Sequence, residues 1–331
     1  MRLFSSDSPF TWVTFTLALL PAVLSSPLLP KRTRGVSMGL HTDFPDPSFL
    51  KAADGMWYAF ATNGNGKRIQ VASSKDFSSW TLLDIEALPT LSSWETDKDH
   101  YAPDVVLRDD GKYVMYYSGE AKSDVGHHCV GTAIADNPTG PYVPSDTPLS
   151  CRLDQGGSID PAGFKDKDGA RYVTFKVDGN SVGHGGNCNN GIEPLVSTPI
   201  MLQKVQADGV TPIGDAVQIL DRSTADGDGP LVEAPSLVLR GGTYFLFYST
   251  HCYTDDAYDM RWATATNIAG PYTKTNVELV KTGDGLISPG GATVCGCGDR
   301  MLFHGWCDDS KKIRCMYYAD VNLSGRTATI V

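Results

Sequence analysis

The sequence predicts an all-β chain folded as a five-bladed β-propeller, and three observations support this prediction. One pattern occurs five times: a short polar entry, an apolar run, a polar turn and a second apolar run rich in aromatic residues. The copies follow one another at intervals of about sixty residues, and each is followed by two further strand-like runs. Helical periodicity is almost absent. Four-stranded sheets repeated radially are propeller blades; a pair of β-sandwiches, the alternative, would not require a regular repeat.

The five copies can be read in order along the chain. They are "FPDPSFLKAADGMWYAFAT" from Phe44, "APDVVLRDDGKYVMYYSG" from Ala102, "DPAGFKDKDGARYVTFKVDG" from Asp160, "APSLVLRGGTYFLFYST" from Ala234 and the weaker "GGATVCGCGDRMLFHGW" from Gly290. The third unit is the longest. Its extra length is expected in "DGNSVGHGGNCNNG", Asp178 to Gly191, which would form a wall of a pocket or decorate its rim.

The N-terminus carries an apolar segment, "FTWVTFTLALLPAVLSS", that ends in small residues. It is typical of a secretory signal, with a signal anchor as the alternative. A dibasic pair, Lys31-Arg32, follows and predicts either a processing site or a solvated tail. We therefore expect residues 1–32 to be a signal peptide with a propeptide, and residues 33–331 to be a single catalytic propeller. The expected protein is secreted, extracellular and monomeric.

The net charge of −10 argues against nucleic acid and against an anionic membrane surface as the partner. Eight cysteines in a secreted chain predict disulfides. Cys307 and Cys315 flank a polar turn, so we expect them to pair. Zinc bound by these two with Cys295 and Cys297 is the alternative. The sequon at Asn322 predicts a glycosylated surface loop.

Three carboxylates stand at the entrances of predicted first strands: Asp46, Asp160 and Glu233. An acid before a proline is usually a turn former. In a propeller, however, the first strands of all blades line the central axis, so these three acids should meet at one face. Two opposed carboxylates with a water between them are what inverting glycoside hydrolysis requires. A third carboxylate can raise the pKa of the acid toward the working pH.

The motifs "FPDPS", "YAPDV", "SIDPAGF" and "VEAPSL", in this order over nearly the whole mature chain, resemble glycoside hydrolase family 43, which degrades arabinan and xylan. The resemblance to these secreted enzymes, of fungal type here, implies an inverting mechanism. It implies Asp46 as general base, Asp160 as the residue that orients the acid and raises its pKa, and Glu233 as general acid.

Two departures from the family pattern stand out. Tyr101 occupies a place that often holds tryptophan. Gly291 stands where many members carry a histidine near a central metal, so no cofactor is expected to be required and a structural calcium is in doubt. His304 in "LFHGW" could supply an imidazole from a neighbouring strand, or it could be a hydrogen-bonded core residue.

Residues near the strand entrances are candidates for sugar contacts, although the same residue types suit a propeller core. They are Trp94, His100, Tyr101, Asp104, His251 and His304. The expected partner is a plant polysaccharide or oligosaccharide, cleaved at α-L-arabinofuranosidic linkages, in arabinan and from the chain end. Endo-1,5-α-L-arabinanase and β-xylosidase activity are the alternatives within the family. A retaining fructan-processing enzyme and a non-catalytic, carbohydrate-binding propeller are the rivals outside it.

Overall fold

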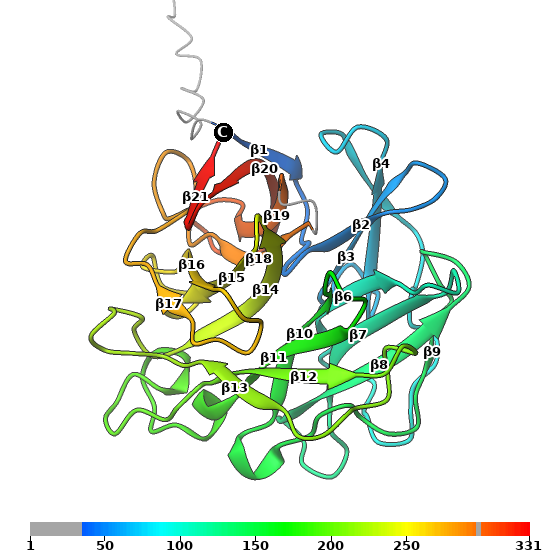
Figure 1. Cartoon of the computed structure of the whole chain (residues 1–331), viewed down its shortest axis with the longest axis horizontal. Coiled ribbons are helices and arrows are strands. Elements are labelled where there is room, and N and C mark those ends of the chain that lie inside the picture. The colour runs from blue at the N-terminus through cyan, green and yellow to red at the C-terminus, as the bar shows by residue number, and fades with distance from the viewer. Residues whose placement is uncertain (1–34, 296–298) are drawn as a thin grey trace, which may run out of the picture. The chain divides into compact units, whose positions relative to one another are not determined.

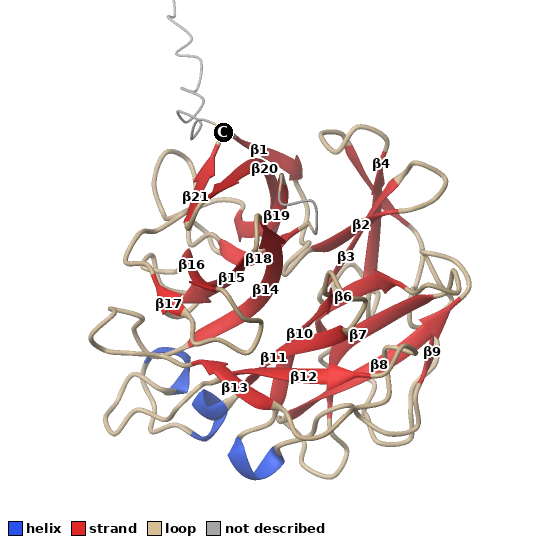
Figure 2. Cartoon of the chain, in the orientation of Figure 1, coloured by secondary structure: helices blue, strands red, loops and turns tan. Residues whose placement is uncertain are grey.

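The computed structural model describes residues 35–295 and 299–331 (Figure 1). These residues form five antiparallel sheets arranged as the blades of a β-propeller, with three short 3₁₀ turns as the helical elements of the described part (Figure 2). Within the described ranges, no helix has the length and apolar character that crossing a membrane requires. The predicted signal peptide and Cys297 lie outside the described residues.

Blades I to IV each consist of four consecutive strands. Blade I holds β2 (Ser48–Lys51), β3 (Trp57–Ala61), β4 (Gln70–Ser74) and β5 (Trp80–Leu83). Blade II holds β6 (Tyr101–Leu107), β7 (Tyr113–Glu120), β8 (His128–Ala135) and β9 (Val143–Pro144). Blade III holds β10 (Ser158–Lys165), β11 (Arg171–Val177), β12 (Ile200–Val205) and β13 (Val217–Leu220). Blade IV holds β14 (Val232–Arg240), β15 (Thr243–Thr250), β16 (Asp259–Ala265) and β17 (Thr273–Lys274). The predicted repeat of four strands is confirmed in all four.

Blade V closes the ring with a strand from the other end of the chain. Its order is β18 (Gly290–Val294), β19 (Arg300–Trp306), β20 (Arg314–Ser324) and then β1 (Val36–Leu40), while β21 (Thr327–Ile330) also pairs with β20. In Figure 1 the blue β1 lies beside the red β20, and Val36 pairs with Ala319. The first and last segments of the described chain are thus hydrogen-bonded in one sheet.

The middle strands of the blades are apolar on both faces because neighbouring blades cover both sides. Every residue of β7 and β16 is buried. Between blades I and II, Val71 packs with Met115 and Tyr117 in one apolar cluster. Between blades IV and V, Phe245 and Phe303 belong to another. Sheets that are buried on both faces read as continuous apolar runs rather than as alternation, which is the pattern of the five copies.

The entrances of the five first strands share one backbone conformation. The residue at each entrance has a positive φ: 52° at Asp46, 42° at Ala102, 55° at Asp160, 51° at Ala234 and 59° at Gly291. A left-handed conformation costs a non-glycine residue on the order of 1 kcal/mol, so it persists only where the surroundings hold it. A register shift follows at this point in blades II to V. The local bulge changes the direction of the side chains at the point where the first strands enter the central channel of the propeller.

Side chains from the preceding blade hold four of these entrances. The entrance N–H groups of Ala102, Asp160, Gly291 and Asp46 donate to Thr62 Oγ1, Ser118 Oγ, Ser249 Oγ and His304 Nδ1, respectively, over 2.8–3.0 Å. Each acceptor lies at the end of the second strand of its blade or just after it. There it stands opposite the residue before the entrance of the same blade; Ser118, for example, pairs with Tyr101. We call these acceptor positions the entrance ring. The fold therefore uses one recurring side-chain position to link four of the five blades to the next one.

In blade III the insertion follows the second strand, as predicted. The chain between β11 and β12 contains two 3₁₀ turns, Gly179–Val182 and Asn187–Asn189. A disulfide joins Cys188 to Cys252 of blade IV, and Asn187 donates to Asp255 over 2.8 Å. These links attach the insertion to the neighbouring blade.

Two further disulfides join Cys129 to Cys151 and Cys307 to Cys315, and the second confirms the predicted hairpin pair. Asn322 of the sequon is exposed but lies in the strand β20, paired with Thr329 of β21. The prediction of a loop at this position was wrong, because the chain continues the sheet through a terminal hairpin.

Candidate active site

A pocket of about 280 Å³ lies where the first strands begin, and the three predicted acids line it together. Asp46 comes from the entrance of blade I, Asp160 from blade III and Glu233 from blade IV. The other polar lining residues are Tyr101, Lys176, Asp178, Asn180, Tyr253, Tyr258 and Arg314. A larger cavity of about 680 Å³ lies at the far ends of the first strands and contains none of the three acids.

Asp46 is surrounded by groups that stabilise its charge. Thr62 Oγ1 donates to Oδ2 over 2.6 Å, and an Arg314 guanidinium nitrogen lies 3.5 Å from Oδ1. Burial opposes ionisation, yet the positive charge of Arg314 and the contacts with His304 and Thr62 outweigh it and lower the pKa of Asp46 well below its ordinary value. This carboxylate is therefore ionised and able to accept a proton.

Asp160 lies in the opposite electrostatic environment. Its Oδ2 accepts the backbone N–H of Ala234 over 3.0 Å, which ties it to the residue after Glu233. Burial, the negative charge of Glu233 and that of Asp46 raise the pKa of Asp160 to about 8, against the opposing charge of Lys176. The three carboxylates thus retain a proton at neutral pH.

Both oxygens of Glu233 are held by neighbours. The Tyr258 hydroxyl donates to Oε1 over 2.8 Å, and the ammonium of Lys176 donates to Oε2 over 3.1 Å. The Tyr258 ring lies where any side chain at residue 290 would collide with it, since a Cβ on Gly290 would come within 2.0 Å of the ring. A glycine in blade V therefore makes room for a hydrogen-bond partner of Glu233.

The predicted sugar-binding residues divide into two groups. Tyr101 lines the pocket, with its ring 4.6 Å from that of His128. His304 lies directly behind the pocket against Asp46. The structure places the other four outside the lining of this pocket; they are Trp94, His100, Asp104 and His251. Sugar contact by these four stays a prediction that this pocket does not support.

Packing explains the positions of those four residues. Trp94 and His100 stack on the buried ring of Tyr117. Asp104 Oδ2 accepts the backbone N–H of Gly163 over 2.7 Å and so links blade II to blade III. The imidazole of His251 lies against Gly229, where a Cβ would meet it at 2.5 Å.

The insertion that begins at Asp178 forms part of the lining, as one of the two predictions for it had it. Four other lining residues were not anticipated from the sequence, namely Lys176, Tyr253, Tyr258 and Arg314. None of them stands beside a repeated proline, the motif that marks the three acids. Lys176 alone carried a signal, because it occupies the repeated position at the end of the second strand. Tyr253 is 38% exposed at the pocket, and the Arg314 guanidinium lies 5.1 Å from its ring centre. An aromatic ring in this position suits stacking against a sugar.

Two places in the described part of the chain bring together groups of the kinds that bind metals. A cavity of only about 30 Å³, which shares Asp46, Asp160 and Ala234 with the pocket, is also lined by Gly291. His304 is buried beside it, and within the described residues its Nε2 has no hydrogen-bond partner. A Cβ on Gly291 would lie 2.6 Å from this imidazole, which is too close. The absence of a side chain at residue 291 therefore leaves the space in which His304 contacts Asp46. The imidazole therefore reaches the channel from β19 instead of from residue 291.

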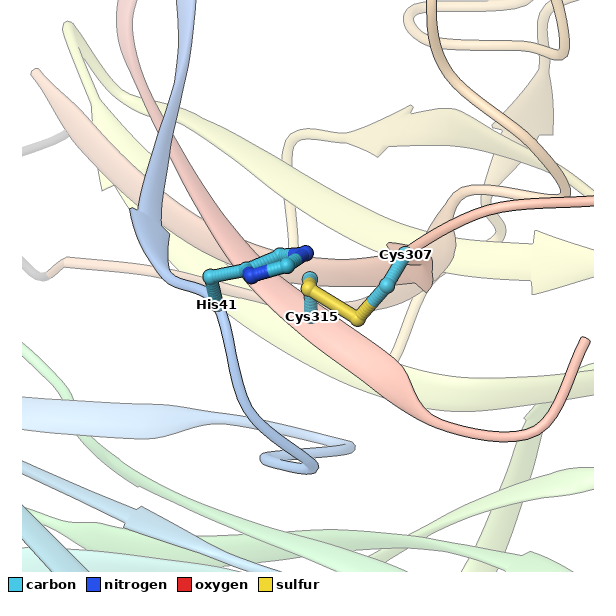
Figure 3. Close-up of side chains that lie close together, drawn as sticks. All are labelled: His41, Cys307 and Cys315. Carbon is cyan, nitrogen blue, oxygen red and sulfur yellow. A yellow bond between two sulfur atoms is a disulfide. The ribbon is translucent and has the colours of Figure 1, made fainter.

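The second place is the cluster of His41, Cys307 and Cys315 (Figure 3). Both sulfurs are bonded to each other, so neither is available as a thiolate ligand. The zinc alternative for these two cysteines is wrong, because they use their sulfurs in the disulfide.

A propeller with three carboxylates around one pocket at the channel mouth defines a class of glycoside-cleaving enzymes, and comparisons with known proteins agree. The model of the glycosyl hydrolases family 43 matches residues 40–326. The chain is 25% identical over 301 residues to the extracellular endo-α-(1→5)-L-arabinanase 1 of Bacillus subtilis, which covers 84% of this chain and 85% of that protein. It is 28% identical over 291 residues to a probable arabinan endo-1,5-α-L-arabinosidase C of Aspergillus flavus, covering 84% and 83%.

Among solved structures, a thermostable family-43 glycoside hydrolase superposes with a TM-score of 0.74 at 23% identity, covering 88% of this chain and 94% of that one. This likeness supports the fold. The chain belongs to glycosyl hydrolases family 43, and it is therefore a glycoside hydrolase.

Proposed function

We propose that this protein is a secreted α-L-arabinofuranosidase that removes arabinofuranosyl units from the chain ends of plant arabinan with inversion of configuration. One observation carries the proposal. A carboxylate that is held ionised, Asp46, lies in the same small pocket as a carboxyl pair that keeps a proton, Asp160 and Glu233. This division of protonation states is what single-displacement hydrolysis requires.

In the proposed reaction, Asp46 accepts a proton from a water molecule as the water oxygen attacks the anomeric carbon. Glu233 gives its proton to the glycosidic oxygen as that bond breaks, so the leaving sugar departs as a neutral alcohol. Asp160 fixes the backbone at Ala234, and its negative neighbours favour a protonated state of the pair. No metal takes part in this proposal.

Two features support attack from the chain end. The pocket volume of about 280 Å³ lies just below the usual range of ligand pockets, about 300–1,000 Å³, and suits a terminal sugar unit better than a polymer segment. One side of the pocket is formed by the insertion, through Asp178, Asn180 and Cys188. The disulfide to Cys252 holds this side in place.

The second candidate is endo-1,5-α-L-arabinanase activity. It is favoured by the names of two relatives that each cover 84% of the chain, both of which are called endo-acting. Other relatives are named β-xylosidase and xylosidase/arabinosidase.

A substrate panel with product sizing separates these activities. The panel contains linear arabinan, arabinoxylan, reduced arabino-oligosaccharides, and aryl α-L-arabinofuranoside and β-D-xyloside. We expect arabinose as the first product from linear arabinan and from its oligosaccharides. Early release of oligosaccharides would replace the proposal by the endo-acting alternative, and cleavage of the xyloside alone would reject the arabinosidic substrate.

Secretion is part of the proposal. Its support is the use of cysteines for disulfides and the word "extracellular" in the names of two relatives. Expression of the full chain in a eukaryotic host, followed by N-terminal sequencing of the medium protein, tests it. Retention of the uncleaved chain in the cell would contradict it.

A further inference from the structure

We propose that Lys176 is a positioning residue for the general acid: its ammonium holds Oε2 of Glu233, leaves Oε1 to carry the proton, and is itself balanced by Asp178. The inference rests on the proposed role of Glu233 in the hydrolysis. It concerns residues of blade III that do not need to touch the substrate.

The first argument comes from the entrance ring. In four blades this position holds a side chain that accepts the next blade's entrance N–H. Blade III has Lys176 there, since Lys176 pairs with Ile159, the residue before the entrance. An ammonium has no acceptor atom. The N–H of Ala234 donates to Asp160 instead, so blade III departs from the rule that the rest of the fold follows.

The second argument is the cost of this lysine. Its side chain is only 1% exposed, and a buried ammonium is strongly unfavourable unless it is paired. Its Nζ lies 3.1 Å from Glu233 Oε2 and 3.0 Å from Asp178 Oδ1. Burial alone would lower the pKa of Lys176, but the charges of Asp178, Glu233 and Asp160 outweigh burial and raise it. The lysine is therefore a permanent cation between two acids.

The third argument concerns the two oxygens of Glu233. Lys176 can only donate, so the oxygen that faces it cannot at the same time direct a proton toward it. The hydroxyl of Tyr258, which contacts Oε1, can either donate or accept. A proton on Oε1 is thus compatible with both neighbours, whereas a proton on Oε2 pointing at the ammonium is not. The geometry assigns the transferable proton to Oε1.

The charge balance around Glu233 determines how readily it keeps that proton. Lys176 from β11 favours the ionised form of Glu233, whereas the negative charge of Asp46 from the entrance of blade I favours its protonated form. His304 from β19 is buried and its pKa is lowered by burial and by Arg314, which leaves it neutral. The Tyr258 pKa is raised well above its ordinary value, so it also stays neutral. Asp178 is then the group that offsets the charge of Lys176.

The test is a pair of variants with opposite expected effects on the pH profile of kcat/KM. The basic limb of the profile reports loss of the acid's proton. Lys176→Met removes a positive charge beside Glu233, so the basic limb should move to higher pH by about one unit. Asp178→Asn leaves the ammonium unbalanced, so the limb should move to lower pH by about one unit. The double variant should lie close to the wild type.

Orientation of the acid gives a second readout. Lys176→Met should lower kcat about tenfold to a hundredfold on oligosaccharides, as misplaced catalytic groups do. The loss should shrink on an aryl glycoside whose leaving group needs no proton. Lys176→Arg keeps the positive charge, so the basic limb of its pH profile should lie at the same pH as in the wild type. The control is Arg261→Met, which removes a buried cation paired with Asp259 in blade IV and should leave the limb unchanged.

Limb shifts in the same direction for Lys176→Met and Asp178→Asn, or no shift in either, would overturn the inference. If Asp178→Asn raises KM and leaves the pH profile of kcat/KM unchanged, Asp178 is a substrate-binding residue. This outcome would also overturn the inference that Asp178 offsets the charge of Lys176. The profile is measured on whichever glycoside the wild type cleaves. A wrong choice of arabinoside in the proposed function therefore shows in the wild type, before any variant is compared.

Discussion

At the residue scale, Asp46 and Asp160 show how neighbours decide what a carboxyl group can do. Both are aspartates with a positive φ in front of a proline, and both line one pocket. Arg314 and Thr62 bind Asp46, whereas Asp160 faces two other acids. The pKa of Asp46 is lowered and that of Asp160 is raised to about 8, so the same side-chain type is shifted in opposite directions by its neighbours.

The proposed roles of the acids predict different responses to leaving-group quality. Asp46→Asn and Glu233→Gln should each lower turnover on arabinan at least about a hundredfold, the usual contribution of a positioned base or acid. On an aryl arabinofuranoside with a good leaving group, Glu233→Gln should keep much of its activity and Asp46→Asn should not. Steady-state rates on both substrates test this, and equal losses on both would contradict the assignment.

Asp104 gives a prediction about stability. Burial raises its pKa to about 6 from an ordinary 3.8, although the N–H groups of Gly163 and Val105 act in the opposite direction. The folded protein therefore binds a proton between these pH values that the unfolded chain has released, and this contribution to stability is lost as the pH rises through that window. Asp104→Asn cannot lose a proton there. The difference in Tm, variant minus wild type, should increase from pH 4 to pH 7.

Thermal unfolding followed by circular dichroism at several pH values measures that difference. The matched control is Asp109→Asn, which removes an exposed aspartate in the turn after β6 whose pKa is lowered by contacts with Lys165 and Arg171. Its Tm difference should not increase with pH. A constant difference for Asp104→Asn would mean that Asp104 titrates at its ordinary pKa.

The sequence allowed the three acids to be predicted because each lies one or two residues before a proline at a repeated place. It did not allow Lys176, Tyr258 or Arg314 to be predicted as lining residues. These come from second and third strands or from loops, and their approach to the acids depends on the bulges at the entrances and on small residues such as Gly290. Such effects are set by tertiary packing and have no local pattern. Tyr101 was anticipated because it directly precedes the repeated Ala-Pro.

At the element scale, the blade repeat was predictable and the closure of the ring was not. Four strands per blade follow from alternating turns and apolar runs of fixed spacing. β1 precedes the first recognised copy, and its pairing with β20 depends on a contact between residues nearly 300 positions apart, as in Val36 and Ala319. Pairing at this separation leaves no periodic trace in the sequence.

The insertion of blade III gives the prediction at this scale. Cys188→Ala with Cys252→Ala should loosen the pocket wall from blade IV, because the disulfide is the covalent link between them and the side-chain hydrogen bonds of Asn187 and Asn190 would remain. We expect a higher KM on an aryl arabinofuranoside and oligosaccharides among the early products from linear arabinan. Cross-links of this kind contribute about 2–4 kcal/mol to stability, so the Tm should also fall.

The control for that experiment is the double variant of Cys129 and Cys151, whose disulfide lies in blade II and does not line the pocket. It should lose stability in the same range without any change in product sizes. If both double variants give the same kinetics, the insertion does not restrict access to the pocket, and chain-end attack must have another cause.

At the scale of the whole molecule, the propeller explains why residues from distant parts of the chain can act on one bond. The entrance ring links four of the five blades to the next one, and the strand β1 joins the last blade to the first described segment of the chain. Asp46, Asp160 and Glu233 are thereby fixed from three separate sheets. A rigid frame of this kind holds two opposed groups at a constant separation, which a water-mediated displacement needs.

The stereochemistry of the first product tests the frame and the site together. If water attacks from the side of Asp46 while Glu233 protonates the leaving oxygen from the other side, one displacement occurs and the anomeric configuration inverts. An α-L-arabinofuranoside should then release the β-sugar first, as proton NMR can record in the first minutes, before mutarotation mixes the anomers. Hydrolysis in heavy-oxygen water should place the label on the anomeric carbon. Initial release of the α-sugar would require two displacements through a covalent intermediate, which these roles of Asp46 and Glu233 do not allow.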